Sequence, residues 1–442
     1  MGASESRLLK ATENNDATAI GRIVKANEES ARRAKDSLDK ALCEAAKWNA
    51  CAAAEALIAY GARANNEPNK PLINPLMIAA HFNDIDMMQL LLDHNANVED
   101  ESPKGGTALF FAVVHNHREA VKLLLDNNAN TEHKNKEGET VLMRAASKGF
   151  SGVVRLLVER GANVDATNEI TGDVALTYAA VNNELGAAQI LIEGKAVIEH
   201  KNKLGQTALM FAAARNAVYV MSLLIKEGAN VNTTDNKQCT ALFLTTRRDC
   251  GEAAKLLIQN EADIKHKNET GDTALMRAAA KNATDVMREL LLHRPDVNVT
   301  NNVGDTALSQ AAKANFPKAV EMLARSGADI NHLNHNRETP LFQAISADAL
   351  DAFKELLQFG AGIAAGPDTA ADDVQRRSVI KKRVVLYECA KQHKAKRIAA
   401  FLQREESERL CSPPPPPYSK INWTTSHDDN EEPRRPTIST LS

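Results

Sequence analysis

One short segment recurs along the chain with a nearly constant spacing. Gly271–Ala280 reads GDTALMRAAA, and versions of it begin at Gly106, Gly138, Gly205 and Gly304. The reference position is the Thr of TAL, or the residue that replaces it. It falls at Ser6, Lys40, Asn74, Thr107, Thr140, Val174, Thr207, Thr240, Thr273, Thr306, Thr339 and Val384. The steps are 33 or 34 residues until a last step of 45. A period in this range predicts a solenoid of stacked units.

Two apolar positions recur within each unit. Leucine stands two residues after the reference position in all twelve units. Alanine follows three residues later in ten of them, with Thr245 and Cys389 as exceptions. Residues at i and i+3 share one face of a helix. The pattern therefore predicts a short helix that packs closely against its neighbours through the small alanine.

The ends of the helices can also be read from the sequence. Asn, Asp or Gly stands nine residues after the reference position in eleven units, and His393 is the exception. These residue types tolerate the left-handed backbone that closes a helix. A second helix follows, such as Asp285–Leu292, and often ends at a glycine such as Gly161. Glu261 and Pro295 are poorer terminators. The Thr at the reference position is expected to cap the first helix.

The order helix, turn, helix and polar hairpin resembles the ankyrin-repeat family. The matching pieces are TPLF at Thr339–Phe342, the TAL…AA segments and the GANV or GADI turns. The resemblance implies an all-α ankyrin-repeat solenoid of paired antiparallel helices with hairpin loops. The chain departs from the family at the residue after the recurring leucine, where the family usually has His and this chain has residues such as Met143 and Met276.

We expect four parts in this chain. Residues 1–39 form an N-terminal capping unit, and residues 40–360 form the ankyrin-repeat array. Residues 361–403 hold an insertion loop and a C-terminal capping helix pair. Residues 404–442 are predicted to be a disordered, proline-rich tail, because their apolar content is too low for a core.

Bulk composition limits the function classes. The formal net charge of -3 does not mark a nucleic-acid binder, and the 4% of aromatic residues leaves few rings to stack on bases. The six cysteines form no CxxC pair, which favours a reducing, cytoplasmic location. No apolar run approaches the ~18 residues of a membrane span. The N-terminal residues lack a hydrophobic signal segment.

No enzyme signature is found. The chain has no phosphate-binding loop, no GxSxG and no HExxH. His133, His200 and His266 recur two units apart, which is too far to share a metal, and His115 and His117 have no further ligands nearby. We therefore expect a non-enzymatic protein with no catalytic residue, no cofactor and no metal.

The family resemblance implies that partners bind the concave side, at the end of the first helix. On this side we predict a row of positive side chains, which we call the groove cations: Lys148, Arg215, Arg247, Arg248, Arg277, Lys281 and Lys313. Phe82 and His115 occupy equivalent positions. The hairpin residues Lys134, Lys136, Lys201, Lys203 and Lys267 are expected to add positive charge. The row predicts an acidic client segment. The alternative is ordinary solvated charge, neutralised by acids such as Glu139 and Asp272.

The two ends of the sequence carry short motifs. MGASES matches the pattern for myristoylation of Gly2, which gives at most weak, reversible membrane association. Pro415, Pro416 and Tyr418 form a PPxY motif within a proline run, typical of ligands of WW domains. An SH3-type or profilin-type partner is the second choice. The plain alternatives are an unmodified N-terminus and an inert linker.

These features together predict a monomeric scaffold or adaptor for protein–protein interaction. Its groove would hold a client, and its tail would recruit a WW or SH3-type module. The alternatives are an N-myristoylated, membrane-proximal signalling scaffold or a ubiquitin-ligase substrate adaptor.

Overall fold

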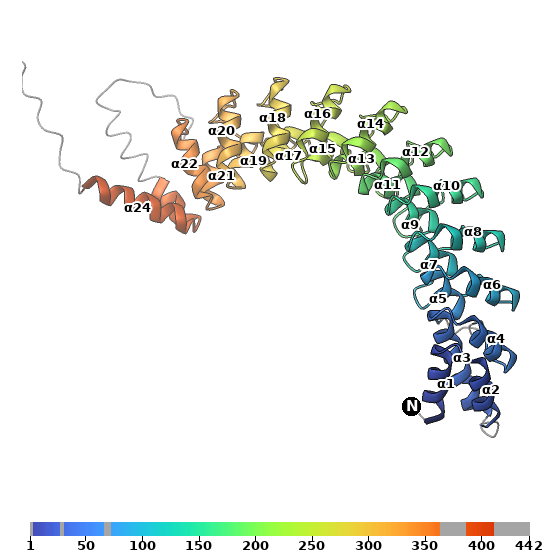
Figure 1. The fold of residues 1–442 in the computed structure, drawn as a ribbon. Helices are drawn as coiled ribbons and strands as arrows, with labels where there is room; N and C mark the ends of the chain where they lie inside the picture. The colour runs from blue at the N-terminus through green and yellow to red at the C-terminus, as the bar shows by residue number, and fades with distance from the viewer. Residues whose placement is uncertain (1–2, 27–30, 66–71, 363–385, 411–442) are drawn as a thin grey trace, which may run out of the picture.

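The protein is a curved array of stacked helix pairs (Figure 1). The computed structural model describes residues 3–26, 31–65, 72–362 and 386–410, and the side chains of residues 5–26, 36–65, 72–362 and 386–405. Within these ranges the only strand-like pairing is an isolated bridge between Thr234 and Thr240. The predicted all-α solenoid of paired helices is therefore confirmed.

The first helices of successive units stack along the inner side of the arch (Figure 1). They are α1 (Ala3–Glu13), α3 (Ala31–Lys47), α5 (Pro75–Phe82), α7 (Ala108–Val114), α9 (Val141–Ser147), α11 (Ala175–Asn182), α13 (Ala208–Ala214), α15 (Ala241–Thr245), α17 (Ala274–Lys281), α19 (Ala307–Lys313) and α21 (Pro340–Ser346).

The second helices project from the outer side of the arch (Figure 1). They are α2 (Ala17–Lys25), α4 (Cys51–Ala59), α6 (Ile85–Asp93), α8 (Arg118–Asp126), α10 (Ser151–Glu159), α12 (Leu185–Glu193), α14 (Val218–Lys226), α16 (Gly251–Gln259), α18 (Thr284–Leu292), α20 (Pro317–Arg325) and α22 (Leu350–Gln358). Residues 386–392 are helical, and α24 (Lys396–Leu410) follows them. This last helix continues beyond residue 404, where the sequence predicts the tail to begin.

The recurring leucine and alanine form the core, as the sequence predicts. All twelve leucines are at most 4% exposed. The exception Thr245 is also fully buried, and its hydroxyl donates a hydrogen bond of 2.7 Å to the carbonyl of Leu242. A buried hydroxyl with this bond avoids most of the cost of burying a polar group.

The helix stops lie where the sequence places them. Residues with positive φ are Asn15, Asn49, Asn83, Asn116, Gly149, Asn183, Asn216, Asp249, Asn282, Asn315 and Asp348. In the last unit the left-handed residue is Lys394, with φ 59°, rather than His393. Ala390 is fully buried there, one residue after Cys389. Both exceptions in the last unit therefore have one cause, an offset of the repeat frame by one residue relative to Val384. The second helix expected to end at Pro295 has its left-handed residue at Arg294.

The predicted threonine cap is present in five of the seven units that have threonine at the reference position and absent in two. The side chains of Thr140, Thr240, Thr273, Thr306 and Thr339 accept a hydrogen bond from the backbone N–H three residues later. Thr107 and Thr207 precede α7 and α13 without such a bond, so the prediction is wrong for these two.

Six of the helix-stop side chains also connect their unit to the next. The carboxamide of Asn216 accepts a hydrogen bond of 2.9 Å from the N–H of Ala253, near the start of α16. Asn15, Asn183, Asp249, Asn315 and Asp348 accept equivalent bonds from the second helix of the following unit. The same residue therefore ends one helix and accepts hydrogen bonds at the N-terminus of another, 36–38 residues later in five cases and 49–50 residues later for Asp348. The sequence pattern showed only the first of these roles.

The hairpins are joined by a second set of side-chain bonds. The imidazole of His200 donates to the carbonyl of Gly172 over 2.9 Å, and His133, His266 and His332 make the same kind of bond to the preceding hairpin. These histidines therefore have a structural role in four of the units. Repetition of that role accounts for the row seen in the sequence.

Candidate protein-binding groove

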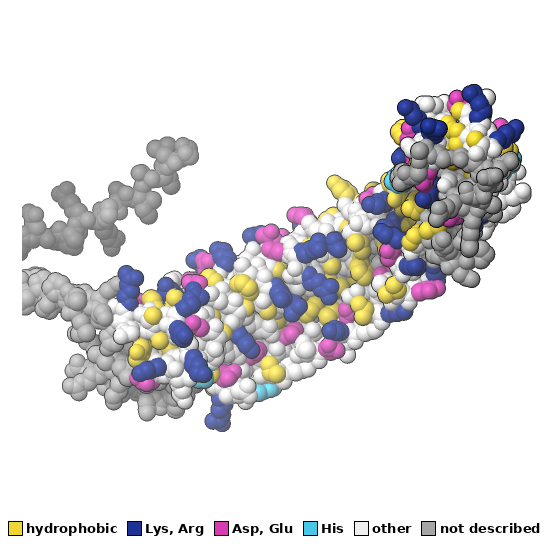
Figure 2. All heavy atoms as spheres, turned by 90° about the horizontal axis from the view of Figure 1, so that it is seen from below, with side chains coloured by type: hydrophobic (Ala, Val, Ile, Leu, Met, Phe, Trp, Pro, Cys, Tyr) yellow, Lys and Arg dark blue, Asp and Glu magenta, His cyan; other side chains and the backbone are white. Residues whose placement is uncertain are grey.

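The inner face of the arch is formed by the ends of the first helices and by the hairpins. Figure 2 looks at the molecule from below the view of Figure 1 and shows Lys and Arg side chains along the middle of this face, with hydrophobic side chains between them. Asp and Glu side chains lie more toward its edges (Figure 2). The face thus combines positive charge with apolar surface.

The groove cations are available to a partner. Six of them are exposed and Arg277 is half-buried. Within the described part of the chain, no carboxylate lies within 4 Å of the charged nitrogen atoms of any of the seven. The guanidinium of Arg277 lies 6.0 Å from the ring centre of Phe243 in the preceding unit. That spacing permits a cation–π interaction, which orients the charge without neutralising it.

The acids that precede the reference threonines are mostly committed to other partners. Asp272 accepts hydrogen bonds from the side chains of Asn301 and Gln310, at 2.8 and 2.9 Å. Asp305 accepts from Asn334 and Gln343 in the same way. Both carboxylates hold successive units together.

Arg144 differs from the groove cations because Glu139 neutralises it. Its guanidinium forms an ion pair and hydrogen bond with the Glu139 carboxylate. It also lies 5.8 Å from the ring centre of Phe110 in the preceding unit. Neutralisation by a neighbouring acid, the alternative left open by the sequence, therefore applies to Arg144. It does not apply to Lys148, Arg277 and Lys281, which have no carboxylate within 4 Å among the described residues.

The hairpin lysines are largely occupied. Lys201 and Lys267 donate to the backbone carbonyls of Thr234 and Thr300 in the next hairpin, at 2.9 and 2.7 Å. Lys134 pairs with Glu169 at 3.2 Å, and Lys203 donates to the carbonyl of Glu169. Their charge is exposed but their ammonium groups stabilise the stack. The groove cations are the better candidates for partner contact.

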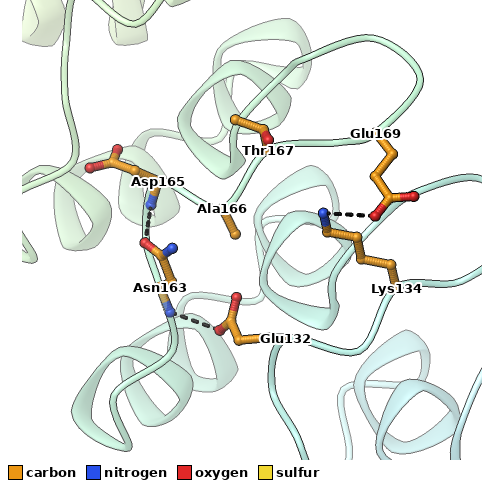
Figure 3. Close-up of a pocket in the computed structure, with 7 residues that line it drawn as sticks. All are labelled: Glu132, Lys134, Asn163, Asp165, Ala166, Thr167 and Glu169. Carbon is orange, nitrogen blue, oxygen red and sulfur yellow. Dashed lines mark hydrogen bonds and ion pairs between the residues drawn. The ribbon is translucent and has the colours of Figure 1, made fainter.

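A cavity of about 560 Å³ lies between two of these hairpins (Figure 3). The Glu132 carboxylate accepts a hydrogen bond from the N–H of Asn163 at 2.9 Å, and the Asn163 carboxamide accepts one from the N–H of Asp165 at 3.0 Å. Lys134 and Glu169 pair across its other side (Figure 3). These polar groups bind one another, so the cavity follows from the spacing of the hairpins and presents little unused hydrogen-bonding capacity.

Phe82 and His115 lie at the N-terminal part of the groove, in a cluster of rings. Phe82 is 49% exposed. The His81 ring centre lies 4.7 Å from that of Phe82 and 4.1 Å from that of His115. The imidazole of His117 stacks on His115 and bonds to the carbonyl of His81 at 2.9 Å. Burial, then the neighbouring His81 and His117, lower the pKa of His115.

Other chemistry has little support in the described part of the chain. No group of three or more His, Cys, Asp or Glu side chains there is arranged to hold a metal ion. Burial raises the pKa of the five described cysteines, and that of Cys43 reaches about 11 with further contributions from Asp39 and Glu44. A thiol with a raised pKa is a poor nucleophile. Among the helices described, none has the length and apolar character needed to cross a membrane.

Gly2 and the tail residues Pro415, Pro416 and Tyr418 lie outside the described residues. The proposed lipidation and WW-domain motifs therefore rest on the sequence.

The fold defines this protein as a helical-repeat solenoid with a charged inner face. The family described as ankyrin repeats (three copies) matches residues 42–135, 76–168, 127–202, 176–268, 246–334 and 275–366. The chain belongs to the ankyrin-repeat family, as the sequence motifs indicate. Such an array is in general a scaffold for protein–protein interaction. A search of curated proteins gives no match.

Proposed function

We propose that this protein is a non-enzymatic adaptor that binds an acidic client segment along the groove cations. The observation that supports the proposal is the absence of a carboxylate within 4 Å of any of these seven side chains in the described ranges. A row of unpaired positive charge chiefly accelerates and orients the association of a negative partner, and its effect weakens with salt.

The test compares two charge reversals of equal size. Arg215, Arg248 and Lys281 are changed to Glu on the inner face. The control changes Lys122, Lys226 and Lys255 to Glu on α8, α14 and α16, where all three are exposed. Proteins retained by the full chain from cell lysate are identified for both variants, and association rates of the strongest partner are measured at two salt concentrations.

We expect the inner reversal to slow association by about 10-fold or more at low salt, with a smaller difference at high salt. The outer reversal should have little effect. Equal binding by both variants would refute the groove assignment, because the two carry the same change in net charge.

The tail supplies the second binding function of the proposed adaptor. Its support is the sequence of Pro415, Pro416 and Tyr418, since proline runs enter aromatic-lined grooves at a low cost in conformational entropy. A purified WW domain should bind the full chain and lose binding to Tyr418→Ala. If an SH3 domain binds the full chain and the Tyr418→Ala variant equally well, the SH3-type alternative is favoured.

A membrane-proximal scaffold and a ubiquitin-ligase substrate adaptor are the second candidates. The former rests on Gly2 in the sequence MGASES. Gly2→Ala should then move the protein from the membrane fraction to the soluble fraction, and an unchanged distribution would exclude it. The latter predicts that a captured WW domain belongs to a ubiquitin ligase and that client ubiquitination requires Tyr418.

A further inference from the structure

A second cavity, of about 660 Å³, opens on the inner face where α5, α7 and α9 meet. We call it the phenylalanine cavity, because Phe110 and Phe111 of α7 line it together with Val114. All three side chains are half-buried. The volume lies in the range typical of ligand pockets, which are mainly apolar with a few polar groups.

The two adjacent phenylalanines arise from the repeat itself. Phe110 and Phe111 follow Leu109, at positions that other units fill with residues such as Met143 and Arg144. Leu109 is fully buried in the stack, while the two rings reach the inner face. Two neighbouring rings are conspicuous in a chain with 11 Phe, but the sequence analysis did not use them as a sign of a site.

The charged residues around the cavity are mainly positive. Its lining includes Lys104, Arg144 and Lys148, against the single carboxylate of Glu137. Glu137 already accepts a hydrogen bond of 2.8 Å from the side chain of Asn135. Lys148 has no carboxylate within 4 Å in the described part of the chain, whereas Arg144 is paired with Glu139. The ammonium group of Lys148 is therefore available to form an ion pair with an acidic ligand.

Two histidines complete the lining of the cavity. His81 from the end of α5 and His115 from the end of α7 both contribute to it, with ring centres 4.1 Å apart. Imidazoles offer a ring face for apolar contact and an N–H group that donates a hydrogen bond to a carboxylate. The cavity therefore differs from the polar cavity of Figure 3, whose charged groups already bind one another.

We propose that the phenylalanine cavity binds one bulky apolar side chain of an acidic peptide, whose flanking carboxylates face Lys148, Lys104 and the two histidines. This inference rests on the proposed function in one respect, that the inner face binds protein. It adds an anchor residue and a location to that function. A buried apolar anchor surrounded by charge is the usual arrangement of the residues that dominate a binding interface.

The test uses three fluorescein-labelled peptides and the full chain. The peptides are Glu-Glu-Phe-Glu-Glu, the same peptide with Ala at the centre, and a Lys-Lys-Phe-Lys-Lys control. Fluorescence anisotropy gives the affinities. We expect the Phe peptide to bind at least about 10-fold more tightly than the Ala peptide, since burial of an aromatic side chain contributes this much or more. The Lys peptide should bind weakest.

Two variants locate the binding. Val114→Phe fills the cavity and should abolish the preference for the Phe peptide, whereas Leu185→Phe on the outer helix α12 should leave it unchanged. Lys148→Glu should weaken both acidic peptides and requires no repacking of the core, so it remains informative if Val114→Phe does not fold. Circular dichroism establishes which variants keep the native fold.

The outcomes separate this proposal from the wider groove. If the Phe and Ala peptides bind alike, or if folded Val114→Phe keeps the preference, the cavity proposal is wrong. Loss of both acidic peptides in the Arg215, Arg248 and Lys281 reversal would then still support the groove. If the preference for Phe persists in that reversal and disappears in Val114→Phe, the cavity is correct. A failure of all three peptides to bind the wild-type chain overturns it.

Discussion

Replacing Asn315 with glycine tests whether the helix stops also hold neighbouring units together. Asn315 has φ 60°, and its carboxamide oxygen accepts hydrogen bonds from the N–H groups of Asp351 and Ala352 at 2.9 and 3.0 Å. Glycine adopts the same left-handed backbone without strain. Asn315→Gly therefore keeps the turn that follows α19 and removes only the side-chain bonds to α22.

The expected loss can be estimated from these bonds. A hydrogen bond in a folded protein contributes about 0.5–1.5 kcal/mol after competition with water, so the two bonds to backbone N–H groups contribute roughly 1–3 kcal/mol. The Asn315 side-chain amide also donates to the Asp351 carboxylate over 3.1 Å, and this exposed bond adds little. A loss of roughly 1–3 kcal/mol corresponds to about a 5–150-fold change in the equilibrium for local opening. The two amides should therefore exchange with deuterium about 5–150-fold faster in the variant, because local opening limits exchange in repeat proteins.

Asn282→Gly is the matched control. Asn282 is the helix stop of α17 with φ 55°, and its side chain makes no hydrogen bond to any other described residue. Its replacement should leave the exchange at the start of α20 unchanged. Residue-resolved hydrogen exchange, by NMR or by electron-transfer fragmentation, measures both variants. Unchanged exchange at Asp351 and Ala352 in Asn315→Gly, or equal effects of the two substitutions, would refute the second role of the helix stop.

Three further predictions concern reactivity, pH and packing. Iodoacetamide at pH 8 should modify Cys43 about 100-fold more slowly than an ordinary thiol, because burial raises its pKa from 9.0 to about 11 and thiolate is the reactive form. Mass spectrometry compares the modification of Cys43 in the folded chain and in the urea-unfolded chain. Equal rates in the two states would contradict the prediction. The Glu-Glu-Phe-Glu-Glu peptide should bind more tightly at pH 5.5 than at pH 7.5, because nearby carboxylates raise the lowered pKa of His115 and binding then takes up a proton; His115→Asn should reduce this dependence. The rings of His81 and His117 lie against His115, Lys148 lines the same cavity, and Asp84 interacts with His117. Leu275→Ala should destabilise its unit by about 2–5 kcal/mol, since a buried leucine leaves a cavity there, and amides of α17 should lose protection while those of α7 keep theirs.

The sequence by itself determined the period, the helix ends and the family. Leu275 and Ala278 are buried and Asn282 is left-handed because these outcomes depend on helix periodicity and on local backbone preference. Both operate within about ten residues, so the residue type at one position is enough to reveal them. In the last unit the predicted helix stop, His393, lies one residue before the observed one, Lys394. A pattern counted from a single leucine, Leu386, cannot reveal an offset of one residue.

Tertiary structure decided which polar groups remain available for a partner. The sequence places Arg144 and Arg277 at equivalent positions, but only Arg144 meets a glutamate, Glu139, among the described residues. Likewise Lys201 and Lys267 look free in the sequence, yet their ammonium groups bond to carbonyls 33 residues away. The two lysine contacts join residues one repeat apart and depend on how successive units stack, whereas the Arg144–Glu139 pair lies within one unit and depends on the fold of its hairpin.

The phenylalanine cavity likewise combines features that the sequence shows with features that only the tertiary structure shows. The sequence establishes that Phe110, His115 and Lys148 lie on or beside the first helices of neighbouring units. Only the stacking of α5, α7 and α9 brings them around one cavity with Lys104 and Glu137 of the hairpins. The repeat pattern depends on interactions within one unit, so it can be read from the sequence of that unit. A binding surface is formed by side chains from several units, so it exists only when those units are packed together.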